Sequence, residues 1–284
     1  MTRDPRAVLR DAGLRPKKSF GQNFLVAGNI AASIAQACVH DDEVGHARVV
    51  EIGAGTGVLT RLLAGRARTV AAIERDRDLV PLLKREMTDT GVRVVEADAQ
   101  TVDLAALLGD PEPGSPRVLC GNLPYAITGP LLRRTMEHAD HVERVVFMVQ
   151  EEVVERLGAS PGTKAWGALT VFMRAAFDVR RVLRAPPGAF HPPPEVSSAV
   201  VELLPVRPPR AMETGRFRAL VRGAFGARRK TLRNAWSKLA PDAATLEAAA
   251  ARAGVSLAAR GETLDVEAFA RMADALDRAA TGEA

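Results

Sequence analysis

In the first half of the chain, short apolar runs alternate with segments whose apolar residues recur at helical spacing. The runs begin at Arg48, Thr69, Val92, Arg117 and Arg144, and each is followed by a polar or glycine-containing turn. Runs of this length predict buried strands, and the segments between them predict helices. This alternation predicts an α/β fold with a mostly parallel sheet that carries helices on both faces.

The second half of the chain changes character. Two further apolar runs, Val179–Leu183 and Ser197–Leu204, complete a predicted seven-stranded sheet. From Thr214 onward the apolar positions show only helical spacing. We therefore predict two domains, residues 1–205 with the sheet and residues 206–284 with helices alone.

The first predicted strand leads directly into a glycine turn, in which Gly53 and Gly55 let the backbone approach a ligand closely. The next two strands end in Glu74 and Asp98. Either acid alone could be a turn or cap residue, but ligands of open α/β sheets bind at the carboxyl ends of the strands. Together they predict an adenosine site, in which Glu74 accepts from the ribose hydroxyls and Asp98 from the adenine amino group.

The fourth strand ends in Asn122-Leu123-Pro124-Tyr125, which contains the chain's single tyrosine. A lone motif of this kind is commonly just a proline-containing strand exit. Beside an adenosine site, however, the Asn122 side-chain oxygen and the Leu123 carbonyl can accept both hydrogens of an adenine amino group. The nitrogen could then aim its lone pair at an electrophile, while Pro124 stiffens the Leu123 carbonyl and Tyr125 offers a stacking face.

The residues at this strand end also distinguish between two possible adenosine-containing cofactors. A nicotinamide dinucleotide would require a proton donor for hydride transfer, whereas acceptors and a flat ring suit methyl transfer from S-adenosylmethionine. Phe190 lies in a proline-rich segment and could form the second wall of a base slot opposite Tyr125. The same segment could equally be only a rigid loop.

The basic residues are unevenly distributed. The net charge of +5 is only a weak indication of a polyanionic partner. Residues 206–240, however, carry ten Lys or Arg and a single acid, Glu213. Such an imbalance favours a nucleic-acid surface over a solvated helix face. Lys17 and Lys18 could also meet phosphate, although such a pair is often only a surface feature.

The sequence gives little support for other kinds of site. Cys38 and Cys120 are expected to be buried thiols, because two cysteines make neither a disulfide framework nor a zinc site. His138 and His141 are expected to lie on the surface, and we expect no bound metal. No apolar run approaches a membrane span and the N-terminus has no apolar signal core, so we expect a cytoplasmic protein.

From about Lys17 to Ala275 the chain resembles the ribosomal RNA adenine N6,N6-dimethyltransferases of the KsgA type. The matching segments are Lys18-Ser-Phe-Gly-Gln-Asn-Phe-Leu, Glu51-Ile-Gly-Ala-Gly-Thr-Gly, Asn122-Leu-Pro-Tyr, Phe190-His-Pro-Pro-Pro-Glu-Val-Ser-Ser-Ala-Val-Val and Arg228-Arg-Lys-Thr-Leu-Arg-Asn. The resemblance implies a Rossmann-like class I methyltransferase fold with a small C-terminal all-helical domain. It also implies S-adenosylmethionine-dependent dimethylation of two adjacent adenines in the 3′-terminal hairpin loop of 16S rRNA, in the assembling small ribosomal subunit.

Roles for particular residues follow. We expect S-adenosylmethionine to contact Asn23, Leu25, Gly53, Gly55, Glu74, Asp98 and Asn122. The target adenine is expected between Tyr125 and Phe190. RNA is expected to meet Lys17, Lys18, Arg222, Arg228, Arg229, Lys230 and Arg233.

Three alternatives stay open. Antibiotic-resistance relatives that methylate large-subunit RNA share the fold and the Asn-x-Pro-aromatic motif, but the segment 225–234 and the triple proline favour the small-subunit type. The protein could also act chiefly as a ribosome-assembly factor, and a nicotinamide oxidoreductase is the most distant possibility. No heptad pattern is apparent, so we expect a monomer.

Overall fold

A computed structural model describes residues 3–227 and 229–281, which form two compact units. The first comprises the residues up to Val154 together with Val179–Pro205, and the second comprises Glu155–Asp178 together with the residues from Val206 onward. From the sequence we predicted that residues 155–178 belong to the domain that contains the sheet. The structure places this segment in the second unit, because Val171 and Ala175 belong to the core of that unit.

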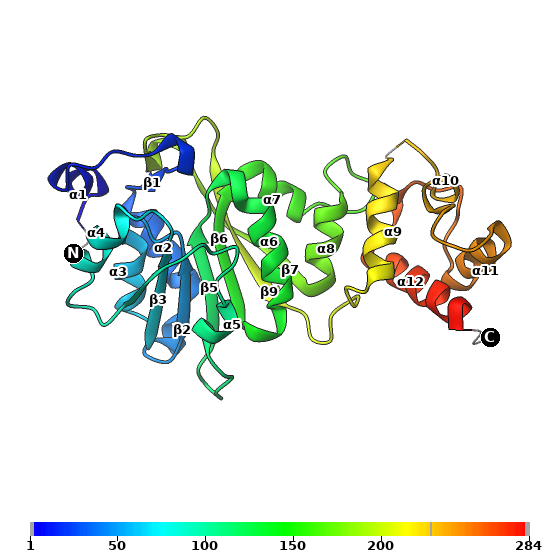
Figure 1. The fold of residues 1–284 in the computed structure, drawn as a ribbon, viewed down its shortest axis with the longest axis horizontal. Helices are drawn as coiled ribbons and strands as arrows, with labels where there is room; N and C mark the ends of the chain where they lie inside the picture. Colours follow the sequence, from blue (N-terminus) through cyan, green and yellow to red (C-terminus); the bar gives the residue numbers. More distant parts are fainter. Residues whose placement is uncertain (1–2, 228, 282–284) are drawn as a thin grey trace. The chain divides into compact units, whose positions relative to one another are not determined.

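A seven-stranded sheet forms the centre of the first unit, with the strand order β4-β3-β2-β5-β6-β9-β7 (Figure 1). The strands are β2 (Arg48–Ile52), β3 (Thr69–Glu74), β4 (Arg93–Glu96), β5 (Arg117–Asn122), β6 (Arg144–Gln150), β7 (Phe177–Ala185) and β9 (Ser198–Pro205). Neighbours from β4 to β6 are parallel, whereas β9 runs antiparallel to β6. The predicted mostly parallel seven-stranded sheet is confirmed.

Both faces of this sheet are buried. The helices of this unit are α1 (Pro5–Asp11), α2 (Gly28–Cys38), α3 (Val58–Ala64), α4 (Leu79–Glu86), α5 (Leu104–Leu108) and α6 (Thr128–Glu137). Helix α7 (Glu151–Leu157) begins in this unit and ends in the second. Helices α2 and α3 share a core with Cys120 of β5. Because side chains alternate along a strand, Leu119 points to the opposite face, where it is also fully buried.

Cys38 and Cys120 are free, buried thiols, as predicted.

A two-stranded ribbon joins two segments for which we predicted no strand. It pairs β1 (Phe24–Leu25) antiparallel with β8 (Phe190–His191), so that Leu25 lies opposite Phe190. Two-residue strands show no alternation that a sequence pattern could reveal. The ribbon fixes the N-terminal segment beside the proline-rich segment.

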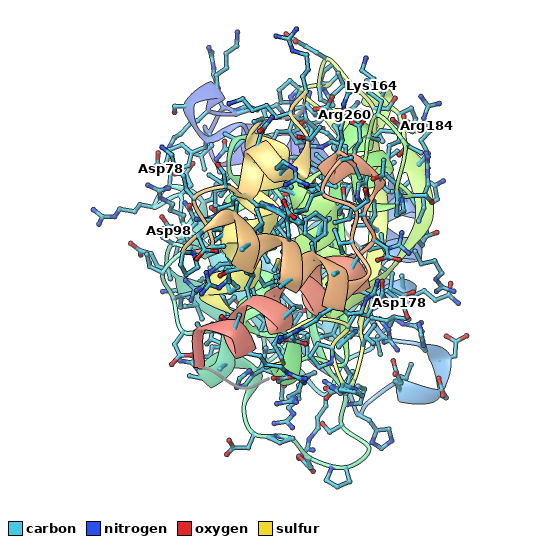
Figure 2. All side chains as sticks on the ribbon, turned by 90° about the vertical axis from the view of Figure 1, so that its right-hand side faces the viewer. Asp78, Asp98, Lys164, Asp178, Arg184 and Arg260 are labelled. Carbon is cyan, nitrogen blue, oxygen red and sulfur yellow. The ribbon has the colours of Figure 1, made fainter. Side chains whose placement is uncertain are left out.

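The second unit is helical. Its helices are α8 (Ala168–Ala176), α9 (Gly215–Gly226), α10 (Leu232–Trp236), α11 (Ala243–Ala253) and α12 (Val266–Thr281). Trp166, Trp236, Phe217 and Phe269 are completely or almost completely buried in its core. Charged side chains such as Arg260 remain exposed at its surface (Figure 2). No helix within the described residues is both long and apolar enough to cross a membrane.

Candidate active site

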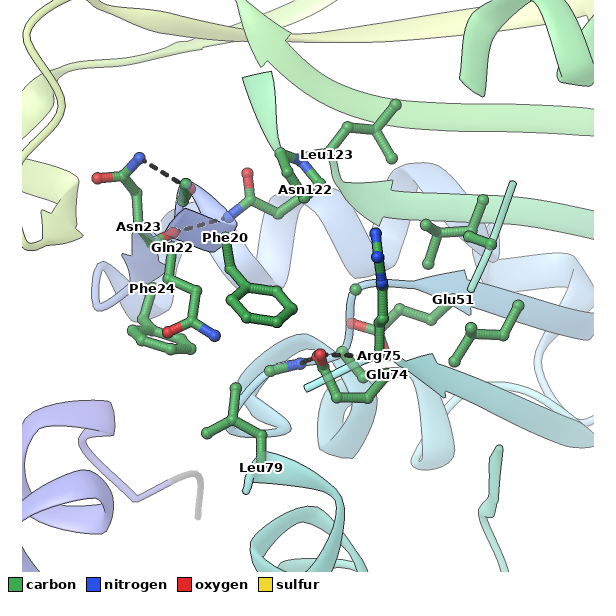
Figure 3. Close-up of a pocket in the computed structure, with 18 of the residues that line it drawn as sticks. Phe20, Gln22, Asn23, Phe24, Glu51, Glu74, Arg75, Leu79, Asn122 and Leu123 are labelled. Carbon is green, nitrogen blue, oxygen red and sulfur yellow. Dashed lines mark hydrogen bonds between the residues drawn. The ribbon is translucent and has the colours of Figure 1, made fainter. Parts of the chain in front are cut away.

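A cavity of about 260 Å³ opens where β2, β3 and β5 end. The N-terminal segment 19–25 forms another part of its wall (Figure 3). Ten residues predicted to act in catalysis or cofactor binding line it: Asn23, Leu25, Gly53, Gly55, Glu74, Asp98, Asn122, Leu123, Pro124 and Tyr125. The fold therefore gathers residues separated by about a hundred positions into one site, as expected for the carboxyl edge of a parallel sheet.

The glycine turn after β2 needs its glycines for space and for backbone conformation. At Gly55 the backbone φ is +57°, a left-handed conformation that side chains disfavour. A Cβ atom there would also lie 3.2 Å from the Phe24 ring. The absence of a side chain at Gly55 therefore lets the Phe24 ring pack closely against the turn.

Glu74 is held rigidly at the end of β3. Its Oε2 accepts a hydrogen bond from the Gly55 N–H, and its Oε1 accepts from the N–H groups of Arg75 and Asp76, all at 2.8 Å. Burial raises the pKa of this carboxyl above its usual value, although these three bonds oppose the shift. Each carboxylate oxygen can accept more than one bond, so Glu74 can still receive ligand hydroxyls.

Asp98 is oriented from two sides. Its Oδ1 accepts from the Gln100 N–H at 2.9 Å, and its Oδ2 lies 3.2 Å from the Arg75 guanidinium. Arg75 itself lines the cavity. A ligand amino group that binds Asp98 would therefore meet this ion pair.

The Asn122 amide has a defined orientation. Its Nδ2 donates to the main-chain carbonyl of Asn23 at 3.0 Å (Figure 3). Because a carbonyl can only accept, this bond identifies the nitrogen end and leaves Oδ1 as an acceptor. The Leu123 N–H donates to the Met148 carbonyl at 3.0 Å, which ties the following residue to β6.

The two aromatic residues predicted to hold the adenine lie in different environments. Tyr125 is half-buried and its hydroxyl is 2.7 Å from the Ser198 Oγ; burial raises the pKa of the phenol. Phe190, in contrast, is 3% exposed within the core beneath α2 and does not line the cavity. The ring of Phe20, which is 37% exposed, does line it. The structure thus brings Phe20 to the site and leaves Phe190 in the core.

Glu51 is a cavity residue that the sequence analysis did not single out. It is 2% exposed, and its Oε2 has no hydrogen-bond partner among the described residues. Burial raises the pKa of Glu51 to about 7; the Thr60 hydroxyl opposes this shift, and the nearby Glu74 carboxylate adds to it. The available signal was an acid inside the otherwise apolar run of β2. A buried carboxylate of this kind can receive a cationic ligand group.

The predicted RNA-binding residues divide into three groups. Lys17 forms ion pairs with Asp76 and Asp78, each at 2.6 Å. Arg233 pairs with Glu247. The described structure shows no ion pair for Lys18, Arg222, Arg229 and Lys230, which are all exposed, and Arg228 lies outside the described residues.

Within the same described ranges, no group of three or more His, Cys, Asp or Glu side chains could hold a metal ion.

Comparison with known sequences covers nearly the whole chain. The model of a family described as ribosomal RNA adenine dimethylase matches residues 13–278. The ribosomal RNA small subunit methyltransferase A of Myxococcus xanthus (strain DK1622) is 45% identical over 278 residues, which cover 96% of this chain and 95% of that protein. The protein of the same name from Anaeromyxobacter sp. (strain K) is 46% identical over 278 residues, with 94% and 96% covered.

Solved structures agree with this comparison. A dimethyladenosine transferase from Plasmodium falciparum has the same fold, with a TM-score of 0.76 at 24% identity over 91% of this chain and 98% of that one. The 23S rRNA methyltransferase ErmE has a TM-score of 0.65 at 28% identity, over 90% of this chain and all of its own. The predicted class I methyltransferase fold is confirmed. The chain belongs to the ribosomal RNA adenine dimethylase family and is an rRNA adenine dimethyltransferase.

Proposed function

We propose that this enzyme transfers methyl groups from S-adenosylmethionine to the N6 amino groups of two adjacent adenines in the 3′-terminal hairpin loop of 16S rRNA. Each adenine would be methylated twice, during assembly of the small ribosomal subunit in the cytoplasm, by a monomeric enzyme. The observation that carries this proposal is the Asn122 amide, whose oxygen is left as an acceptor because its nitrogen binds the Asn23 carbonyl. The names of the bacterial relatives, which are small-subunit methyltransferases, support the choice of RNA.

The cavity residues fit S-adenosylmethionine chemically. Asp98 and Glu74 offer carboxylates to the adenine amino group and the ribose hydroxyls, and Asn23, Leu25 and the glycine turn complete the wall. The Glu51 Oε2, buried and without a partner in the described chain, matches the ammonium group of the methionine part. When bound, this cofactor supplies an electrophilic methyl group on a sulfonium sulfur.

The residues at the end of β5 would activate the target nitrogen by position. The lone pair of an adenine amino group is delocalised into the ring, so the free amine is a weak nucleophile. If the Asn122 Oδ1 and the Leu123 carbonyl each accept one N–H, the nitrogen becomes pyramidal and its lone pair can point at the methyl group. This mechanism relies on orientation and electrostatics and needs no covalent intermediate with the enzyme.

Tyr125 would bind the face of the adenine. Its hydroxyl is anchored at Ser198, so the ring has little freedom to rotate away from the cavity. An adenine in a hairpin loop is already partly unstacked and can enter such a site at low cost. Phe20 lines the same cavity and is a second candidate for an aromatic contact.

The second unit would supply RNA affinity. Arg222, Arg229 and Lys230 are exposed cations without an ion pair in the described structure, and they can meet phosphate groups. Arg233 would first have to leave Glu247. A surface of this kind binds RNA in general, so the choice of target would rest on the site and on the shape of the RNA.

Labelled methyl transfer tests the proposal. Purified small and large ribosomal subunits that lack adenine dimethylation are incubated with the enzyme and labelled S-adenosylmethionine. Label in the small subunit alone is expected. Absence of label from the small subunit, with cofactor binding confirmed by calorimetry, would contradict the proposal.

A second candidate is methylation of large-subunit RNA. The likeness to ErmE, a 23S rRNA methyltransferase, favours it because the match covers all of that chain. The identity is only 28%, however, compared with 45% for the small-subunit methyltransferase from Myxococcus xanthus. Label in the large subunit alone would support this alternative.

A further inference from the structure

Lys17 is engaged inside the first unit rather than available to RNA. Its ammonium group lies 2.6 Å from Asp76 Oδ1 and 2.6 Å from Asp78 Oδ2. Asp76 is 2% exposed, whereas the Lys17 side chain is 35% exposed. A cation between two carboxylates has little charge left to attract phosphate, and breaking the pair would leave Asp76 buried without its cation.

Gln22, at the other end of the segment 17–22, also binds within the cluster formed by Lys17, Asp76 and Asp78. Its Oε1 accepts from the Lys17 N–H at 2.8 Å, and its Nε2 donates to Asp76 Oδ2 at 2.7 Å. Lys17 and Gln22 therefore hold the two oxygens of one carboxylate. The segment 17–22 is folded into a closed turn against the residues that follow β3.

The same segment carries two features of the active site. The Phe20 ring lines the cavity, and its centroid lies 5.4 Å from the Lys17 ammonium. Asn23 follows Gln22 directly, and its main-chain carbonyl accepts the hydrogen bond from the Asn122 amide. The position of the Asn23 carbonyl thus decides which end of the Asn122 amide faces the cavity.

Asp76 also touches the cofactor side of the site. Its N–H donates to Glu74 Oε1 at 2.8 Å, so one residue contacts both the N-terminal segment and the carboxylate expected to bind ribose. Burial alone would raise the pKa of Asp76, but the bonds from Lys17 and Gln22 outweigh it and lower that pKa below its usual value. The cluster therefore stays ionised at neutral pH.

We propose that Lys17, Gln22 and Asp76 are positioning residues, which fix the segment 17–23 on the end of β3 and thereby set the orientation of the Asn122 amide. This inference rests on the proposed function, in which the Asn122 oxygen accepts from the target amine. It assigns to Lys17 a role in the active site in place of an RNA contact.

Lys17→Gln and Lys18→Gln form a matched pair for the test, because the two lysines are adjacent and only Lys17 is ion-paired in the described structure. Three quantities are measured on the full chain: hydrogen exchange of segment 17–23 without ligand, kcat at saturating RNA and cofactor, and the salt dependence of RNA binding. Gln22→Ala, which removes no charge, is measured alongside.

In Lys17→Gln and Gln22→Ala we expect the segment to exchange at least about fivefold faster and kcat to fall about 10-fold to 100-fold, with the salt dependence of RNA binding unchanged. Lys18→Gln should leave the exchange of the segment close to that of the unmodified enzyme and should lower the salt slope of RNA binding, as loss of a phosphate contact would. The inference is overturned if Lys17→Gln leaves exchange and kcat unchanged, or if it lowers the salt slope by about one unit, as loss of a phosphate contact would. If the unmodified enzyme showed no methyl transfer, the proposed function would be wrong. The hydrogen-exchange result does not depend on activity and would still test the positioning role.

Discussion

At the scale of single residues, the two ends of the Asn122 amide have different tasks. The nitrogen donates to the Asn23 carbonyl, and in the proposed mechanism the oxygen accepts from the target amine. The sequence predicted the oxygen as an acceptor, because the residue follows a strand beside an adenosine site. It did not predict the anchor, because Asn23 is 99 positions away. An acceptor that is already fixed does not have to reorient during the reaction. Such preorganisation is the usual source of electrostatic catalysis.

Replacing Asn122 by Ala should remove this acceptor without disturbing the sheet. We expect kcat to fall about 100-fold to 1000-fold, the usual range for loss of one preorganised hydrogen-bonding group. The thermal midpoint and RNA affinity should change little, because the side chain is only partly buried. Steady-state methyl transfer at saturating RNA and cofactor measures kcat. An unchanged kcat in Asn122→Ala would exclude the amide from the mechanism.

Glu51 gives a prediction about pH. Its pKa in the folded enzyme is raised from 4.5 to about 7, so the folded state favours the protonated carboxyl. The stability that this group contributes is present below its unfolded pKa and is lost as the pH rises through 7. Glu51→Gln, which resembles the neutral form, should therefore stabilise the ligand-free enzyme by up to about 3 kcal/mol above pH 7 and much less below pH 4.5.

Chemical denaturation at pH 5 and pH 8 checks this difference. Glu96→Gln is a matched control, because Glu96 also lies on a strand of the same sheet but is exposed. If Glu51→Gln changed the free energy of unfolding by the same amount at both pH values, the pKa of Glu51 would not be raised in the folded enzyme.

At the scale of elements, strands with several apolar residues could be predicted from the sequence. The positions where these strands end also predicted where the cavity lies. The ribbon of β1 and β8 could not, because its two residues per strand carry no pattern. This ribbon has consequences for the site. It places Phe190 opposite Leu25, with its side chain buried in the core and not among the residues that line the cavity, and its contact with the target adenine stays a prediction.

The contact between β2 and β5 gives a test at this scale. A Cβ atom on Gly121 of β5 would lie 2.3 Å from the Ile52 carbonyl oxygen, so that one of the two strands would have to move. Gly121→Ala should therefore lower the free energy of unfolding by about 2–3 kcal/mol or more. Gly129→Ala in α6, where a Cβ meets nothing within 4 Å, should be neutral or slightly stabilising. Equal unfolding free energies for the two variants would contradict this account of the strand contact.

At the scale of the whole molecule, the sequence indicated a basic helical part but not the state of each charge. Residues 206–240 contain ten basic residues, yet Arg210, Arg216, Arg218 and Arg233 all form ion pairs within the second unit. Their acidic partners lie outside the basic stretch in all but one case, so a local count of charge could not identify them. The extension of the second unit to residues 155–178 was hidden for the same reason, since it depends on packing between distant segments.

The exposed cations without ion pairs in the described structure should dominate RNA binding. Changing Arg222, Arg229 and Lys230 together to Gln is expected to weaken RNA binding and to reduce the slope of log K against log salt by about 2–3 units. Changing Arg6, Lys84 and Arg93 together to Gln, three exposed cations of the first unit, removes the same net charge and serves as the control. Filter binding across a salt series measures both slopes, and equal slopes for the triple variant and the unmodified enzyme would remove this surface from the interface.

The most direct test of the central claim is to identify the methylated nucleosides in small-subunit RNA by mass, after reaction with the unmodified enzyme and with Asn122→Ala. We expect N6,N6-dimethyladenosine at two adjacent adenines of the 3′-terminal hairpin loop with the unmodified enzyme. We expect almost none with Asn122→Ala. Methylation at another base or atom, or equal dimethylation by both proteins, would contradict the proposed function.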